Sequence, residues 1–156
     1  MMKDRIVFIT GASSGIGLGC ARKFASQGAS LILNARNVTV LEDIKKELET
    51  KYATRVLLLP FDVRNRDEVA KALTSLSQEW QAVDVLINNA GLVIGLDKEH
   101  QGNLDEWDVV IDTNIKGLLT VTRLLVPGMV ERGRGHIINI GSIAGDGAYP
   151  GGSVYC

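Results

Sequence analysis

The chain has 156 residues, of which 46% are hydrophobic and 22% are charged, and its formal net charge is −1. This length suits one domain, and the composition is that of a globular protein, not of a disordered, collagen-like or membrane-embedded one. The near-neutral charge provides no basic surface for nucleic acid or anionic lipid, so we expect neither partner. Cys20 and Cys156 lack metal-ligand spacing and fit a reducing cytoplasm, and the N-terminal residues show no targeting signal.

Five apolar runs bounded by turn residues predict β-strands, at residues 5–10, 30–35, 55–60, 84–88 and 135–141. A helical pattern follows each of the first four runs. This alternation predicts a parallel sheet with crossover helices on both faces, because strands covered on both sides read as nearly continuous apolar runs.

Apolar residues recur at helical spacing between the strands. The first helix has Ile16, Cys20 and Phe24 at steps of four, and the second has an apolar stripe of Leu41, Ile44 and Leu48. We expect both helices to turn these residues toward the sheet.

A longer helix is expected over residues 104–132, where Pro127 and Gly128 should kink or end it. Asn114 lies on the same stripe as its apolar residues, which are Trp107, Val110, Ile111, Leu118, Val121 and Leu125.

The segment ITGASSGIG, residues 9–17, joins the first strand to the first helix. Gly11 can form the tight turn, while Gly15 and Gly17 leave room for a pyrophosphate against backbone N–H groups at the helix N-terminus. A glycine turn that binds nothing is the alternative interpretation.

Two further signals end other strands: residues 88–91 (NNAG) follow the fourth strand, and Gly141 and Ser142 follow the fifth. In a doubly wound sheet ordered 3-2-1-4-5, ligands bind in the crevice between strands one and four at the carboxyl ends. The three loops are therefore expected to meet at one nucleotide-binding cleft.

These motifs together resemble the classical, NAD(P)-dependent short-chain dehydrogenase/reductase family. The resemblance is carried by residues 10–17 (TGASSGIG), 62–63 (DV) and 88–91 (NNAG), and by Asn114, Ser142 and Tyr155, with a thirteen-residue step from Ser142 to Tyr155 that matches the family. Residues 112–145 further resemble the branch that oxidises 3-hydroxy acids such as serine and allo-threonine with NADP.

The resemblance implies a fold, an activity and an assembly. The fold would be one α/β, Rossmann-like NADP-binding domain over residues 1–156, with the strand order 3-2-1-4-5 and its C-terminal strands missing. The activity would be hydride transfer between NADP(H) and a secondary alcohol or ketone, with a 3-hydroxy acid as the expected substrate. The complete protein would be a homodimer or homotetramer that uses the long helix as a contact.

The resemblance also implies a catalytic tetrad of Asn, Ser, Tyr and Lys, matched here by Asn114, Ser142 and Tyr155. The lysine would stand four residues after Tyr155, whereas the printed chain stops at Cys156. We therefore expect little or no turnover from the chain as printed. For Asn114, which the family uses to hold a water in a proton relay, a structural hydrogen bond to the backbone is an equal alternative.

The coenzyme is expected to be NADP, with NAD less favoured. The position about 20 residues past the glycine loop, where a carboxylate would bind the ribose 2′-hydroxyl, instead reads NARN and carries Arg36. A solvated loop charge is the alternative for Arg36, and helix capping is the alternative for Asp62, which resembles the family's adenine-contacting aspartate. The implied cofactor-binding residues are Gly11, Ser13, Ser14, Gly15, Ile16, Gly17, Arg36, Asp62, Val63, Asn88, Ala90 and Gly91.

Other functions and residues receive plainer interpretations. A noncatalytic dinucleotide-binding module and a 3-oxoacyl-type reductase of the same family are the alternative functions. His100 and His136 lack partners at metal-ligand spacing, so no metal is expected. Trp80 and Trp107 are expected to pack in the core and not to bind substrate.

Overall fold

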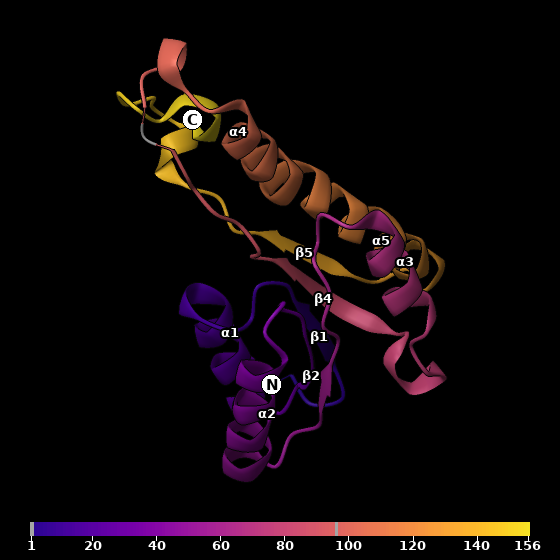
Figure 1. Ribbon diagram of the computed structural model, residues 1–156. Coiled ribbons are helices and arrows are strands. Elements are labelled where there is room, and N and C mark those ends of the chain that lie inside the picture. The colour runs from indigo at the N-terminus through magenta and orange to yellow at the C-terminus, as the bar shows by residue number, and fades with distance from the viewer. Residues whose placement is uncertain (1, 96) are drawn as a thin grey trace.

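The computed structural model describes residues 2–95 and 97–156, and its five parallel strands form one sheet in the order β3-β2-β1-β4-β5 (Figure 1). The strands are β1 (Ile6–Ile9), β2 (Ser30–Leu33), β3 (Val56–Leu58), β4 (Val83–Asn88) and β5 (His136–Asn139). Each lies within two residues of its expected limits. The expected strand order is confirmed, so the topological switch lies between β1 and β4.

Helices cover both faces of the sheet, two on each side (Figure 1). α1 (Gly15–Ser26) and α2 (Val38–Tyr52) cover one face, and α3 (Arg66–Thr74) and α5 (Leu118–Glu131) cover the other. The side chains of β1 alternate accordingly: Val7 and Ile9 are buried on the α1 and α2 side, and Ile6 and Phe8 on the α3 and α5 side.

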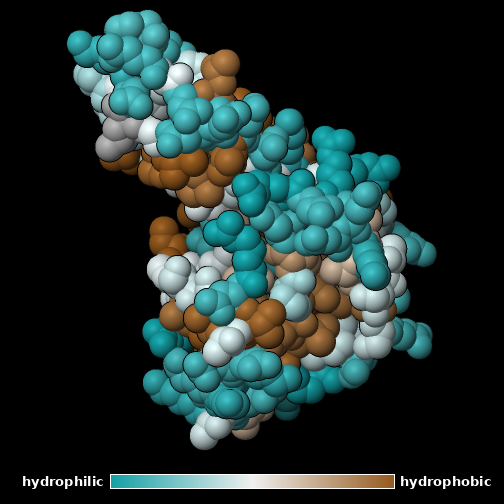
Figure 2. Space-filling view, viewed as in Figure 1, coloured by the Kyte–Doolittle hydropathy of each residue, from teal (hydrophilic) through white to brown (hydrophobic). Residues whose placement is uncertain are grey.

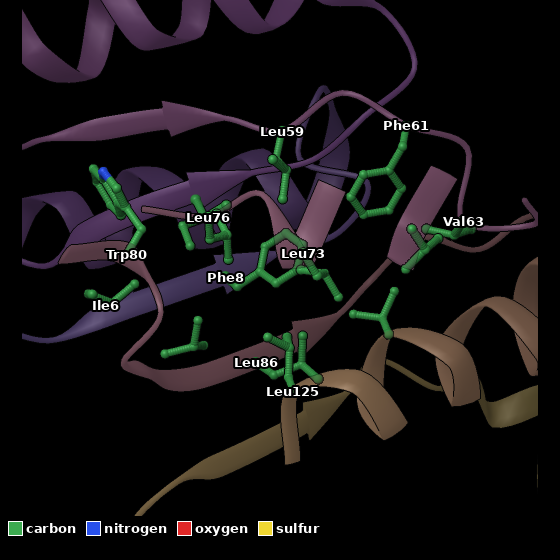
Figure 3. Packing of buried hydrophobic residues seen from close by; sticks show 14 of the residues in the cluster. Ile6, Phe8, Leu59, Phe61, Val63, Leu73, Leu76, Trp80, Leu86 and Leu125 are labelled. Carbon is green, nitrogen blue, oxygen red and sulfur yellow. The ribbon is translucent and has the colours of Figure 1, made fainter. Parts of the chain in front are cut away.

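Figure 3 shows the cluster on the α3 and α5 face. Phe8 and Phe61 meet edge to face with their ring centroids 6.5 Å apart, an arrangement that aromatic quadrupoles favour. Trp80, at the end of the 3₁₀ turn η1 (Gln78–Trp80), is buried in the same cluster. The expected packing of Trp80 in the core is therefore confirmed. Trp107 is only half-buried and is not part of this cluster.

The buried face of α1 agrees with the expected one only in part: Cys20 and Phe24 are half-buried and pack against the core, as expected. Its buried residues are Gly17, Ala21 and Ala25, whereas Ile16 is 60% exposed. The predicted Ile16 contact with the sheet is therefore wrong: small residues line the inner face and let the helix lie close to the strands. In α2 the expected stripe of Leu41, Ile44 and Leu48 is buried and is confirmed.

The long helix is built in three parts: α4 (Leu104–Ile111), the π-helical segment η3 (Asp112–Gly117), and α5. Pro127 lies inside α5, which continues to Glu131. Of the two outcomes expected at Pro127 and Gly128, a kink or an end of the helix, the end is therefore wrong. The helix can continue because Pro127 is exposed. Proline has no N–H to donate to the carbonyl of Arg123, four residues earlier, but Arg123 is exposed as well, so that carbonyl can bond to water. The buried stripe of Val121, Leu125 and Met129 continues past the proline.

Short 3₁₀ turns complete the molecule: η2 (Glu99–Gln101), η4 (Ile143–Gly145) and η5 (Ser153–Tyr155). In Figure 1 the C-terminal residues lie beside the start of α4. Ser153 Oγ also donates to Oε2 of Glu99, in η2, at 2.8 Å. Among the described residues, no helix combines the length and apolar character needed to cross a membrane.

Candidate functional site

The carboxyl ends of the strands open into one cleft of about 850 Å³, a volume typical of ligand sites. Figure 2 shows the molecule hollowed between the lobe that carries the C-terminus and the main body. The loops after all five strands contribute to the lining. Of the residues predicted for the site, the cleft is lined by Gly11, Ser13, Ser14, Gly15, Ile16, Arg36, Asp62, Val63, Asn88, Ala90, Gly91, Asn114, Ser142 and Tyr155.

The glycine loop has the backbone shape that a phosphate site needs. Gly11 has φ +63° and Gly15 has φ +52°, a region that residues with a Cβ disfavour. A Cβ on Gly11 would lie 2.8 Å from the Ala90 Cα, whereas Gly15 has open space around it. Ser14 is the N-cap of α1, but its hydroxyl makes no capping bond. The first-turn N–H groups therefore have no side-chain acceptor, and these residues fit the pyrophosphate of a dinucleotide.

Gly17, predicted to line the pyrophosphate site, does not line the cleft. It is buried in α1, and a Cβ there would collide with the Gly11 carbonyl oxygen and with the Asn89 side-chain amide. Gly17 therefore has no side chain because α1 packs closely against the glycine loop at this position, directly behind the residues that line the cleft.

Thr10 and Asn89 join the glycine loop to the end of β4. Thr10 Oγ1 accepts hydrogen bonds from the backbone N–H groups of Asn89 and Ala90, both at 3.0 Å. The Asn89 Nδ2 donates to the carbonyl oxygens of Thr10 and Gly11, both at 2.9 Å. Asn89 was not among the predicted site residues, although the paired asparagines after an apolar strand were a signal for it.

Asn114 holds the next part of the same cleft wall. Its Oδ1 accepts from the Leu92 N–H at 2.9 Å, and its Nδ2 donates to the Leu92 carbonyl at 2.8 Å. The side chain projects from η3, the π-helical break in the long helix. The structural hydrogen bond to the backbone, one of the two interpretations of Asn114, is therefore present.

Asn88 connects β4 to its neighbours at the cleft edge. Its Nδ2 donates to Thr122 Oγ1 and to Asn139 Oδ1, both at 2.9 Å. Because Asn88 and Asn139 are register partners on β4 and β5, this bond fixes the two strand ends side by side.

Ser142 and Tyr155 line the part of the cleft that lies toward β5. Ser142 Oγ accepts from the Ala144 N–H at 3.1 Å, which leaves the hydroxyl proton free to be donated into the cleft. Tyr155 comes from η5 and is half-buried. The structure thus brings Asn114, Ser142 and Tyr155 to one cleft, although 41 positions separate Asn114 from Tyr155 in the chain.

The charged side chains of the cleft follow β2 and β3. Arg36 is exposed, and Arg64 binds both carboxylate oxygens of Asp62, with Nε 3.0 Å from each and Nη2 2.6 Å from Oδ2. These hydrogen bonds lower the pKa of Asp62 below its usual range, and Arg36 adds to the effect; Asp62 in turn raises the pKa of Arg64. The helix-capping interpretation of Asp62 is wrong, because Asn65 caps α3.

Two further cleft residues were missed from the sequence. Asn34, which is only 1% exposed, donates from Nδ2 to the carbonyl oxygens of Leu59 and Phe61, both at 3.0 Å. It thereby holds the segment that leads to Asp62 against the end of β2. A polar residue ending an apolar run was the available signal. For Arg64 the only signal was its place two residues after Asp62.

The comparison with known proteins decides the family. The family model described as short chain dehydrogenase matches residues 5–156, which is nearly the whole chain. The chain belongs to the short-chain dehydrogenase family. The resemblance read from the glycine, NNAG, serine and tyrosine motifs is therefore confirmed.

Individual relatives agree with this assignment. An NADP-dependent 3-hydroxy acid dehydrogenase of Salmonella typhi is 47% identical over 150 residues, which cover 96% of this chain and 59% of that protein. A protein of the same description from Schizosaccharomyces pombe is 44% identical over 156 residues, covering 99% of this chain and 60% of that protein. The crystal structure of serine dehydrogenase from Escherichia coli superposes with a TM-score of 0.90 at 45% identity, covering 96% of this chain and 68% of that one.

The chain spans about three-fifths of the length of these two curated relatives. The closed form of serine dehydrogenase complexed with NADP+ superposes with a TM-score of 0.88 at 44% identity, covering 96% of this chain and 59% of that one.

Proposed function

We propose that the protein is an NADP-dependent oxidoreductase that transfers a hydride between NADP(H) and a secondary alcohol or ketone, with a 3-hydroxy acid as its substrate class. The observation that carries the proposal is the single cleft shared by the phosphate-type loop at α1 and the hydroxyls of Ser142 and Tyr155. The 3-hydroxy acid rests on the names of relatives 44–47% identical to the chain.

The charge distribution supports one orientation of the coenzyme. The cationic side chains in the cleft, Arg36 and Arg64, follow β2 and β3 and suit the phosphate-bearing adenosine end. Ser142 follows β5, on the opposite side of β1 and β4. The pyrophosphate would therefore lie at the N-terminus of α1, with the nicotinamide toward β4 and β5. When bound, the nicotinamide supplies the hydride acceptor or donor.

Two residues on the β5 side act on the substrate oxygen, one by proton transfer and one by a hydrogen bond. In the oxidative direction the alcohol carbon would give up a hydride to the oxidised coenzyme, and its oxygen would give up a proton to the phenolate oxygen of Tyr155, which becomes the phenol. Ser142 donates its free hydroxyl proton as a hydrogen bond to the same oxygen and so holds it in place. Asn114 acts through its two bonds to Leu92, which keep the loop after β4 in position.

Location and assembly belong to the same proposal. We assign the protein to the cytoplasm, and we assign it a homodimeric or homotetrameric state with α4 and α5 as the contact. The contact is supported by a set of exposed apolar side chains on this helical stretch, which are Leu104, Ile115, Leu119, Leu124 and Val130. Light scattering after gel filtration measures the oligomeric state, and a monomer at working concentration would contradict this part.

The function is tested on the protein at its natural length, with serine, 3-hydroxybutyrate and a simple secondary alcohol as substrates and with NADP and NAD compared. We expect NADP reduction with the 3-hydroxy acids. Tyr155→Phe should lower kcat/KM by about 10²–10⁴-fold, because the proton acceptor is lost. Tyr52→Phe is the control, since Tyr52 lies at the end of α2 and does not line the cleft. NADPH binding without turnover of any substrate would favour the noncatalytic binding module instead.

A further inference from the structure

A hydrogen bond between two side chains joins the segment before α4 to the segment that carries Tyr155. Ser153 Oγ donates to Glu99 Oε2 at 2.8 Å, although 54 positions separate the two residues in the chain. Ser153 begins η5, which contains Tyr155, and η5 packs against α4 (Figure 1). Neither Ser153 nor Glu99 lines the cleft, so any effect of this bond on the reaction passes through another residue.

The turn that carries Glu99 is anchored on α4. A Cβ on Gly102, the residue that follows η2, would collide with the indole ring of Trp107, so the backbone lies directly on the helix there. Asn103, the next residue, is the N-cap of α4 and accepts a hydrogen bond from its first turn. Glu99 therefore presents its carboxylate from a turn that the helix holds in place.

The segment on the other side of the bond carries the two hydroxyls that the proposed mechanism uses, those of Ser142 and Tyr155. In the described part of the chain, the other hydrogen bonds of residues 142–156 are all made within this segment, as in the 2.8 Å bond from the Tyr155 N–H to the Gly152 carbonyl. The bond from Ser153 to Glu99 is thus the one that joins the segment to its surroundings.

The backbone of Ser153 is in an unfavourable conformation. Its φ is +40°, in the left-handed region that residues with a Cβ rarely adopt, and such a conformation persists only where neighbouring groups stabilise it. Glycine would adopt it without strain, as Gly151 does nearby with φ +82°. What serine provides here, and glycine would not, is a hydroxyl that donates to a charged acceptor, which makes a stronger bond than a neutral one.

We propose that Glu99 is a positioning residue for Tyr155: its carboxylate holds the Ser153 hydroxyl and so fixes the turn η5 from which the phenol reaches the substrate oxygen. This inference rests on the proposed oxidoreductase function and deepens it. Proton transfer requires the acceptor within hydrogen-bond distance of the substrate oxygen, so a small displacement of η5 slows the reaction without removing any reacting group.

The test is kinetic and uses the protein at its natural length, with a 3-hydroxy acid and NADP. Glu99→Ala should lower kcat about three- to tenfold, the loss expected when one hydrogen bond no longer orients the proton acceptor. The dissociation constant of NADPH should not change, because Glu99 does not line the cleft. Glu99→Gln should bring kcat to within about twofold of the parent value, since the amide oxygen can still accept from Ser153.

Ser153→Gly separates positioning from stability. It removes the hydroxyl and also the strain at φ +40°, so the urea midpoint of unfolding should stay equal or rise. The kcat should nevertheless fall as far as in Glu99→Ala, whereas a purely structural role would make activity follow stability. The double variant Glu99→Ala/Ser153→Gly should lose no more than either single variant, because both changes remove the same bond.

Glu79→Ala is the matched control. Glu79 is an exposed carboxylate in another 3₁₀ turn, η1, where it accepts a hydrogen bond from Arg55 Nη1 at 2.7 Å, and it does not line the cleft. Its removal should leave kcat and the NADPH dissociation constant unchanged.

Several results would overturn the inference. A parent-like kcat for Glu99→Ala would refute it and leave the proposed function standing, whereas a parent protein that binds NADPH but oxidises no substrate would refute both. Glu99→Gln as slow as Glu99→Ala would mean that the charge acts and not the hydrogen bond, and additive losses in the double variant would mean that the two residues act separately. If Glu99→Ala does not fold, Ser153→Gly decides, and an unchanged kcat in that variant would refute the proposal.

Discussion

Asn114 and Leu92 exchange two hydrogen bonds, one in each direction, between a side-chain amide on η3 and the backbone after β4. The amide thus mimics a strand partner for a segment that has left the sheet. Gly91 lies against it, since a Cβ there would come within 3.4 Å of Asn114 Oδ1. The long helix and the cleft wall are therefore coupled through one side chain.

Asn114→Ala should lower the free energy of unfolding by about 1–3 kcal/mol, because both bonds are lost and the Leu92 backbone groups are left without partners. It should also weaken NADPH binding, since Asn114 and Leu92 both line the cleft. Urea unfolding and fluorescence titration with NADPH measure the two effects.

Asn103→Ala is the matched control for Asn114→Ala. Asn103 caps α4 by accepting from the Asp105 N–H at 2.9 Å, and it does not line the cleft. Its loss should cost about 1 kcal/mol of stability with NADPH affinity unchanged. If Asn114→Ala reduced turnover alone, with stability and NADPH affinity as in the parent, the relay interpretation would replace the structural one.

Thr10→Val should destabilise the protein by about 2–4 kcal/mol, because the N–H groups of Asn89 and Ala90 lose their shared acceptor while the shape of the side chain is kept. Thr10 is only 2% exposed, so water cannot readily replace the hydroxyl. Thermal or urea unfolding gives the number.

Thr10→Ser provides the comparison, since it keeps the hydroxyl and removes only a methyl group, at a cost of about 1 kcal/mol. Equal losses of stability for the valine and serine variants would mean that the methyl group, and not the hydrogen-bond acceptor, accounts for the role of Thr10.

Arg36→Asp should weaken NADP about ten- to a hundredfold and improve NAD, because a charge-assisted contact to the 2′-phosphate is replaced by repulsion while an acceptor for the ribose hydroxyls is gained. Binding of the two coenzymes, compared as a ratio, is the measurement. An NADP:NAD ratio equal to that of the parent would mean that Arg36 is a solvated loop charge.

The strands and the location of the cleft were accessible from the sequence because both depend on local features, whereas the strand order came from the general rule for doubly wound sheets. Apolar runs mark the strands, and residues that follow them must gather at one edge of a parallel sheet. The exposure of Ile16 could not be predicted in this way. The inner face of α1 is formed by small residues such as Gly17 and Ala21, because the helix lies close to the sheet, and the spacing of apolar residues does not reveal that distance. The continuation of α5 past Pro127 likewise depends on exposure, which is a tertiary property.

Contacts that side chains make in the loops were also not predicted. The Asp62–Arg64 and Asn34–Leu59 contacts depend on how the loops after β2 and β3 turn, and no spacing rule predicts that turn. The residues that hold the cleft walls were therefore missed more often than those that line it through a recognisable motif.

Gly17→Ala and Gly19→Ala should change stability in opposite directions although both add one methyl group to α1. At Gly17 the new Cβ meets the Gly11 carbonyl and the Asn89 amide, so the loop must shift; we expect a loss of about 1–3 kcal/mol and weaker NADPH binding. Gly19 is exposed with nothing within 4 Å, so alanine there should stabilise the helix by about 0.5–1 kcal/mol, through reduced backbone entropy, without affecting NADPH. Denaturant unfolding and NADPH titration of both variants measure the contrast. If both alanines stabilised the protein, the close packing of α1 against the glycine loop would be refuted, and with it the explanation of why Gly17 lies behind the cleft wall.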